Sequence, residues 1–132
     1  MKKNSSSPIK FAKSHEWVLI TKNQALIGIS DHAQNLLGDV VFVDLPPIGK
    51  ELNKGDIIGN IESVKTVSDI FSPISGKVSE VNGNLTNEPE LVNSDPYEKG
   101  WLVKIEIDDA NSAELSGLMG QDDYKKYANE SS

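Results

Sequence analysis

The sequence predicts a mainly β fold, a single-domain sandwich or flattened barrel with short helices and a helical C-terminal tail. Between residues 15 and 107, short runs rich in β-branched residues alternate with turn residues, which is typical of many short strands. This region lacks the long crossover helices that a parallel βαβ sheet requires. The length of 132 residues fits one domain.

The first two predicted strands form a hairpin, and a short helix follows it. Residues 17–20 and 25–29 are apolar runs, and the Lys-Asn pair between them suits a tight turn. Ser30 can cap a helix whose apolar positions are Ala33, Leu36 and Leu37. Gly38 then ends this helix.

Four later segments also predict strands: residues 39–45, 57–62, 77–81 and 101–107. The first of these is dense in β-branched side chains and is followed by two prolines. In the last one, apolar and charged residues alternate, so we expect one set to face the core: Trp101, Val103, Ile105 and Ile107.

Helical patterns are weaker and lie mostly near the C-terminus. We expect one helical turn at residues 88–92, a helix over residues 113–119 capped by Ser112, and a last helix at residues 122–127. The polar ends, residues 1–10 and 128–132, are predicted to be disordered. The domain then spans residues 11–127.

Composition excludes several classes of function. Twenty acidic residues and thirteen basic ones, all of them lysine, give a net charge of −7, which is the wrong sign for a nucleic-acid binder. The chain has no cysteine, and its two histidines have no metal-site spacing, so no metal centre is expected. The sequence has neither an apolar run long enough to span a membrane nor a signal-peptide pattern. We therefore expect a cytoplasmic protein.

One lysine lies at the centre of a symmetric pattern. Gly55 and Gly76 are turn residues placed ten residues before and eleven residues after Lys65, which predicts an antiparallel hairpin with Lys65 near its tip. The tip itself has no glycine, proline or asparagine. A solvated surface lysine is the commoner outcome, whereas an accessible amine on a rigid base also suits covalent attachment of a cofactor.

The segment GDIIGNIESVKTVSDIFSPISGKV, residues 55–78, resembles the lipoyl-lysine hairpin of the glycine cleavage system H-protein family. Further blocks resemble the family in the same order: SHEW at 14–17, GISDHAQ at 28–34, LGDVVFV at 37–43, LVN at 91–93, DPY at 95–97 and GWL at 100–102. The resemblance covers residues 11–127 and implies a fold like that of lipoyl and biotinyl carrier domains.

The resemblance implies a carrier that has no catalytic residues of its own. Lipoate would be amide-linked to Lys65 and would receive an aminomethyl group from glycine decarboxylase. An aminomethyltransferase would then take the one-carbon unit, and dihydrolipoamide dehydrogenase would reoxidise the dithiol. A lipoate ligase or a lipoyltransferase would install the cofactor, whose chemistry the protein presents rather than performs.

The resemblance also assigns site residues. The hairpin around the attachment lysine comprises Glu62, Ser63, Val64, Thr66, Ser68 and Asp69. Ser14, Glu16 and Asp69 match positions suited to a cleft for the loaded arm, where carboxylates would attract a cationic amine. The alternative is that these carboxylates are surface or capping groups. His32 is expected at a helix start, and His15 and Trp17 are expected in a strand and the core.

Three other functions remain open from the sequence. A relay protein that donates lipoate to other domains, or that works in an incomplete glycine system, would need the same hairpin. A biotinyl carrier would share the fold, although its lysine is usually flanked by methionines rather than by Val64 and Thr66. An unmodified adaptor would use Lys65 as an ordinary surface residue.

Overall fold

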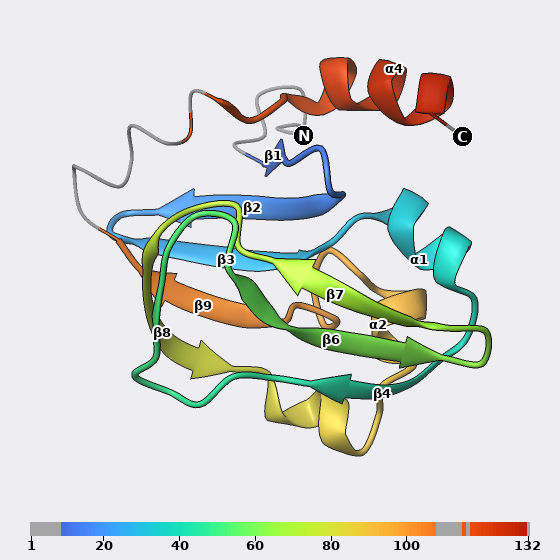
Figure 1. Cartoon of the computed structure of the whole chain (residues 1–132), viewed down its shortest axis with the longest axis horizontal. Coiled ribbons are helices and arrows are strands. Elements are labelled where there is room, and N and C mark those ends of the chain that lie inside the picture. The colour runs from blue at the N-terminus through green and yellow to red at the C-terminus, as the bar shows by residue number, and fades with distance from the viewer. Residues whose placement is uncertain (1–8, 108–114, 116, 132) are drawn as a thin grey trace.

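The computed structural model describes residues 9–107, 115 and 117–131. Its strands form a six-stranded sheet in the order β1-β2-β3-β9-β8-β5 and a three-stranded sheet in the order β4-β6-β7 (Figure 1). All strand pairs are antiparallel. The strands are β1 (Lys10–Phe11), β2 (Glu16–Thr21), β3 (Gln24–Ile29), β4 (Val40–Asp44), β5 (Glu51–Leu52), β6 (Ile57–Ser63), β7 (Val67–Phe71), β8 (Gly76–Val81) and β9 (Val103–Glu106).

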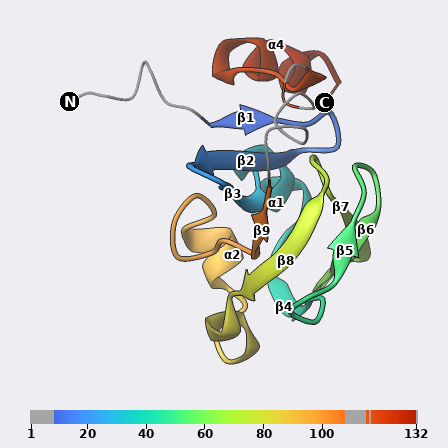
Figure 2. The ribbon, with the colours of Figure 1, turned by 90° about the vertical axis from the view of Figure 1, so that its left-hand side faces the viewer.

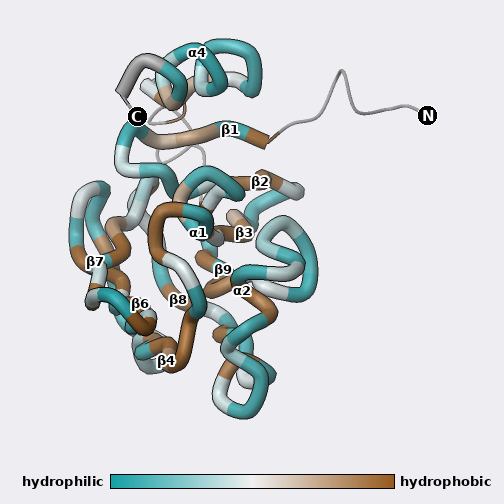
Figure 3. The backbone as a smooth tube through the Cα atoms, turned by 90° about the vertical axis from the view of Figure 1, so that its right-hand side faces the viewer, coloured by the Kyte–Doolittle hydropathy of each residue, from teal (hydrophilic) through white to brown (hydrophobic). Residues whose placement is uncertain are grey.

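The main core lies between the two sheets, which form the two layers seen in Figure 2. Its fully buried members come from both sheets, for example Ile27 on β3, Ile61 on β6 and Ile105 on β9. Hydrophobic segments accordingly concentrate in the strands, whereas α4 is largely hydrophilic (Figure 3). The prediction of a mainly β fold with two layers is confirmed.

A second apolar cluster joins the C-terminal helix to the N-terminal strands. Helix α4 (Gln121–Ser131) lies over β1, and Tyr124 stacks on Phe11 with ring centroids 4.2 Å apart (Figure 1). Trp17 is fully buried below, as predicted, and donates from Nε1 to the carbonyl of Pro96 at 3.0 Å. Gly28 faces its indole so closely that a Cβ there would lie 2.7 Å from the ring.

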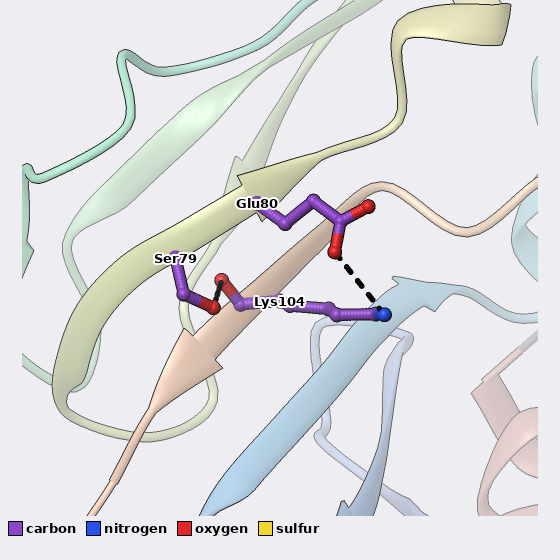
Figure 4. A network of polar contacts seen from close by, with 3 residues as sticks. All are labelled: Ser79, Glu80 and Lys104. Carbon is purple, nitrogen blue, oxygen red and sulfur yellow. Dashed lines mark hydrogen bonds and ion pairs between the residues drawn. The ribbon is translucent and has the colours of Figure 1, made fainter.

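An exposed ion pair lies on the larger sheet. Lys104 on β9 lies opposite Glu80 on β8, and their charged atoms are 3.2 Å apart (Figure 4). The hydroxyl of Ser79 donates to the carbonyl of Lys104 at 3.2 Å. Both charged side chains are partly exposed, so this contact fixes little of the fold.

The predicted strands are all present, as is helix α1 (Asp31–Leu37), whose N-cap hydroxyl on Ser30 accepts the N–H of Ala33 at 3.1 Å. The strand predicted at residues 101–107 is shorter, since β9 covers Val103–Glu106. Trp101, expected to face the core from this strand, lies outside it and is half-buried against the second apolar cluster. The two-residue strands β1 and β5 are too short to give a periodic pattern.

Three helical predictions need correction. The turn predicted at residues 88–92 is replaced by η2 (Gly83–Thr86) and α2 (Leu91–Ser94). Of the helix predicted at residues 113–119, Met119 instead pairs with Phe11 in a β-bridge, while 113, 114, 116 and the Ser112 cap lie outside the described residues. The last helix continues past residue 127 to Ser131, where the sequence predicted a disordered end.

The predicted N-terminal tail, residues 1–10, lies outside the described residues except for its last two. Of these, Lys10 already belongs to β1 and pairs with Val18. The limits of residues 11–127 for the domain stay a prediction.

Candidate functional site

The hairpin predicted from the flanking glycines is formed by β6 and β7. The pairing runs from Ile57 opposite Phe71 to Glu62 opposite Val67. The connection that remains consists of Val64, Lys65 and Thr66, all of them exposed. Lys65 is therefore at the tip of the hairpin, as expected.

A serine side chain supplies the turn chemistry that the tip sequence lacks. The hydroxyl oxygen of Ser63 accepts the backbone N–H groups of Lys65 at 3.1 Å and of Thr66 at 3.2 Å. The backbone N–H of Ser63 donates to the carbonyl of Thr66 at 2.8 Å. The buried Ser63 hydroxyl thus takes the place that a main-chain carbonyl has in a tight turn, so no left-handed glycine is needed.

The tip docks on the connection between α1 and β4. The N–H of Val64 donates to the carbonyl of Asp39 at 2.9 Å, and Figure 1 shows the two segments side by side. Gly38 has φ 80° and ψ −162°, a conformation that is essentially restricted to glycine. The stem of Lys65 lies over it, since a Cβ at Gly38 would be 2.9 Å from the lysine Cε.

A cleft of 130 Å³ lies between this hairpin, α1 and the chain before β2. Ser14, Glu16 and Asp69, the three residues predicted to share a cleft, all line it, together with Ser68. Apolar side chains complete the walls: Ile29, Ala33, Leu36, Leu37 and Ile70. The cleft therefore combines an apolar lining with carboxylates.

Glu16 is the buried acid of this cleft, with 1% of its surface exposed. Its carboxylate accepts the N–H of Phe71, on the outer edge of β7, at 3.0 Å, and accepts the hydroxyl of Ser14. Burial raises the pKa of Glu16 above its ordinary value, although these two hydrogen bonds oppose the rise. Asp69, in contrast, is exposed at the cleft.

His15 lines the same cleft and connects it to α4. Its Nδ1 lies 2.7 Å from the hydroxyl of Tyr124, which is also 2.6 Å from the hydroxyl of Ser30. Burial and the nearby His32, 5.0 Å away between ring centroids, lower the pKa of His15. The expectation that His15 is a strand and core residue is wrong, since it is half-buried at φ 80° in the bend before β2. His32 lies in the first turn of α1, as expected.

The remaining predicted hairpin residues surround Lys65 on the surface. Glu62, Val64 and Thr66 are exposed around Lys65, and the apolar Val64 and Val67 are 66% and 59% exposed. Sequence reasoning missed the residues that hold the tip from outside the hairpin, namely Gly38, Asp39 and Asn93. The sequence marks Gly38 only as a helix end, and no local signal marks Asp39 or Asn93.

Other hollows lie elsewhere. One of 610 Å³ is lined by the β2–β3 turn and β5, and one of 440 Å³ lies between α1 and α4. Among the described residues, no group of three or more histidine, aspartate or glutamate side chains is placed to hold a metal ion. The same part of the chain contains no helix that is long and apolar enough to cross a membrane.

Comparison with protein families shows the group to which the chain belongs. The family model described as glycine cleavage H-protein matches residues 9–131. The chain belongs to this family. Members of the glycine cleavage H-protein family are similar to it over most of its length, which confirms the resemblance found in the sequence.

Two relatives and one solved structure illustrate the similarity in sequence and in fold. The chain is 55% identical over 122 residues to the mitochondrial glycine cleavage system H protein 2 of Arabidopsis thaliana, covering 92% of this chain and 77% of the relative. It is 53% identical over 124 residues to the H protein of Staphylococcus epidermidis, covering 94% and 97%. A crystal structure of the Mycobacterium marinum H protein has a TM-score of 0.80 at 31% identity, covering 95% and 97%.

Proposed function

We propose that this chain is the lipoyl carrier of a glycine cleavage system and that lipoate is attached to it by an amide bond to Lys65. The main support is the geometry of the tip in a member of this family. The amine is exposed for a modifying enzyme, whereas the backbone beneath it is held by Ser63 and Asp39. An exposed amine on a fixed base is what a covalent arm requires.

The cleft fits such an arm. Asp69 follows Lys65 by four residues, and its own position is in β7 on the same side of the hairpin tip, so the arm can lie beside this strand. Its apolar part would pack against Leu36, Leu37 and Ile70. When attached, lipoate supplies a dithiolane that accepts the aminomethyl group of glycine.

Glu16 and Asp69 provide the negative charge of this cleft. An ionised Glu16 would attract the cationic amine of the loaded arm, and its low exposure would strengthen the attraction because little water screens it. The hydrogen bonds from Ser14 and from Phe71 fix the carboxylate in place. The chain thus holds and shelters the loaded group, while its partners perform the chemistry.

The partners we propose are glycine decarboxylase, the aminomethyltransferase, dihydrolipoamide dehydrogenase and the enzyme that attaches lipoate. With a net charge of −7, the carrier would be steered to partners with basic docking surfaces. Raising the salt concentration should therefore raise the Michaelis constant of glycine decarboxylase for this carrier. A constant that stays flat would contradict electrostatic steering.

The proposal is tested with Lys65→Arg and a matched control, Lys22→Arg, which changes an exposed lysine at the tip of the β2–β3 hairpin. Each protein is treated with lipoate ligase, lipoate and ATP, and is then assayed for glycine decarboxylation with the purified decarboxylase. We expect Lys65→Arg to lose both lipoylation and carrier activity, and Lys22→Arg to keep both.

Three outcomes would overturn parts of this proposal. Activity in Lys65→Arg would contradict the attachment site. Lipoylation of the wild type without any decarboxylation would favour a lipoate relay. A wild type that the ligase leaves unmodified would contradict the lipoyl carrier altogether.

A further inference from the structure

We propose that Asn93 is a positioning residue for Lys65, holding the platform on which the attachment lysine rests. Asn93 lies on α2, twenty-eight residues after Lys65 in the sequence, and does not belong to the hairpin. The inference rests on the proposed attachment of lipoate to Lys65. It adds a residue that determines how the amine is presented.

The amide of Asn93 joins both sides of the turn that follows α1. Its Nδ2 donates to the carbonyl of Gly38 at 2.9 Å and to Oε1 of Gln34 at 3.0 Å. Its Oδ1 accepts the N–H of Val40 at 2.9 Å. Both donors and the acceptor of this half-buried side chain are therefore used on one short segment, from the last turn of α1 to the first residue of β4.

The residue enclosed by these hydrogen bonds is the one that holds the hairpin tip. Asp39 lies between Gly38 and Val40, and its carbonyl accepts the N–H of Val64. The Lys65 stem rests on Gly38 itself. A continuous set of contacts therefore runs from Asn93 through the α1–β4 turn to the two residues at the tip.

Presentation matters because Lys65 has to reach an enzyme-bound acyl group. In the attachment step, the uncharged amine of Lys65 attacks the carboxyl carbon of lipoate activated as its adenylate. The new C–N bond forms, the C–O bond to AMP breaks, and the nitrogen loses one proton. Such a step is sensitive to the position of the nucleophile, since a displacement of about 1 Å can cost two orders of magnitude in rate.

Asn82 offers a matched control. It is also an asparagine with three hydrogen bonds, from Nδ2 to the carbonyls of Lys99 and Trp101 at 2.8 Å each, and to its Oδ1 from the N–H of Asn84 at 3.2 Å. It is more deeply buried, with 2% of its surface exposed, and none of its hydrogen bonds reaches the α1–β4 turn. Loss of its side chain should destabilise the fold at least as much as loss of Asn93.

The experiment compares the full-length wild type with Asn93→Ala, Asn93→Asp and Asn82→Ala. Lipoylation by purified lipoate ligase, with lipoate and ATP, is followed by intact mass over a range of carrier concentrations. Hydrogen exchange of the Val64 amide is measured on the same unmodified proteins. The unfolding free energy of each variant gives the general loss of stability.

We expect Asn93→Ala to lower kcat/KM for lipoylation about tenfold and to speed exchange of the Val64 amide by a similar factor. Asn82→Ala should leave both within about twofold of the wild type at an equal or larger loss of stability. Asn93→Asp keeps the acceptor for Val40 but loses both donors. It should resemble Asn93→Ala in kinetics, and it provides the test if the alanine variant does not fold.

Several results would overturn the inference. Equal effects of Asn93→Ala and Asn82→Ala on kcat/KM and on Val64 exchange would show that Asn93 acts only through general stability. Wild-type kinetics in both Asn93 variants would also contradict it. A wild type that accepts no lipoate would instead contradict the proposed function, and the Val64 exchange comparison would still test whether Asn93 holds the tip.

Discussion

Two hairpins of this molecule end in an exposed lysine, and they are built differently. The β2–β3 turn is closed by its own backbone, with Lys22 at φ 56°. The β6–β7 tip is closed by the Ser63 side chain and docked on the α1–β4 turn. The first lysine lies on a turn that is closed locally, although the N–H of Ile107 donates to the neighbouring Asn23 carbonyl at 2.8 Å. The second lysine rests on a turn from another part of the chain, with the Lys65 stem over Gly38. Exposure alone therefore does not separate the proposed attachment lysine from Lys22, but the contacts below the two lysines differ.

Among the variants that test this difference between the two hairpins, Gly38→Ala should have the largest effect on stability and on lipoylation. The φ and ψ of Gly38 would cost an L-residue about 1–3 kcal/mol, and the new Cβ would displace the Lys65 stem. We expect a loss of stability of that order together with slower lipoylation, measured by denaturant unfolding and by ligase kinetics. Gly49→Ala is the control, since Gly49 has φ 97° and its Cβ would meet nothing within 4 Å. Slower lipoylation in both variants would contradict a specific role for Gly38.

Ser63→Ala should open the tip and make it resemble an ordinary loop. Without the hydroxyl, the N–H groups of Lys65 and Thr66 lose their acceptor, at a cost of about 1 kcal/mol. Exchange of these two amides should become faster. Ser79→Ala, which removes a hydroxyl bonded to Lys104, should leave them unchanged. Unchanged exchange in Ser63→Ala would mean that the backbone alone closes the turn.

Glu16→Gln should change how stability depends on pH. Because the pKa of Glu16 is raised in the folded protein, its contribution to stability is present below the ordinary glutamate pKa and is lost as the pH rises through the folded value. The stability of the wild type relative to Glu16→Gln should therefore fall as the pH is raised from below the ordinary glutamate pKa through the higher folded value. Urea unfolding across this range measures the difference. A constant difference would contradict the raised pKa.

The smallest effect is expected at the exposed pair on the larger sheet. Glu80→Ala removes the contact with Lys104, whose side chain is 35% exposed while that of Glu80 is 53% exposed. A pair of this kind contributes at most about 1 kcal/mol. We expect a stability change below that value and unchanged lipoylation. A slower ligase reaction in Glu80→Ala would show that the lysine site depends on the far sheet.

The sequence predicted what local patterns encode. The β-branched residues of 39–45 and the alternation in 77–81 predict the strands that the structure contains. The spacing of Gly55 and Gly76 predicts that Lys65 lies at a hairpin tip. What it missed depends on contacts between distant residues. Met119 has helical spacing but is held as a bridge by Phe11, more than a hundred residues away. Asn93 meets Gly38 only because α2 packs beside α1, which no pattern within either segment indicates.

The same division applies to the cleft. Ser14, Glu16 and Asp69 were grouped through resemblance and do lie on one cleft. The connection of His15 to Tyr124 was not predicted, because α4 reaches it from the other end of the chain. The burial that raises the pKa of Glu16 likewise arises from α1 and β7, which are packed against it only in the folded protein.

The most direct test of the account is the intact mass of the protein from lipoate-replete cells, followed by peptide mapping of residues 55–77. We expect the mass of one lipoyl group, located on Lys65, with Lys22 unmodified. A biotin-sized addition on Lys65 would assign the chain to carboxylation chemistry. An unmodified Lys65, in cells whose other lipoyl domains are loaded, would contradict the account.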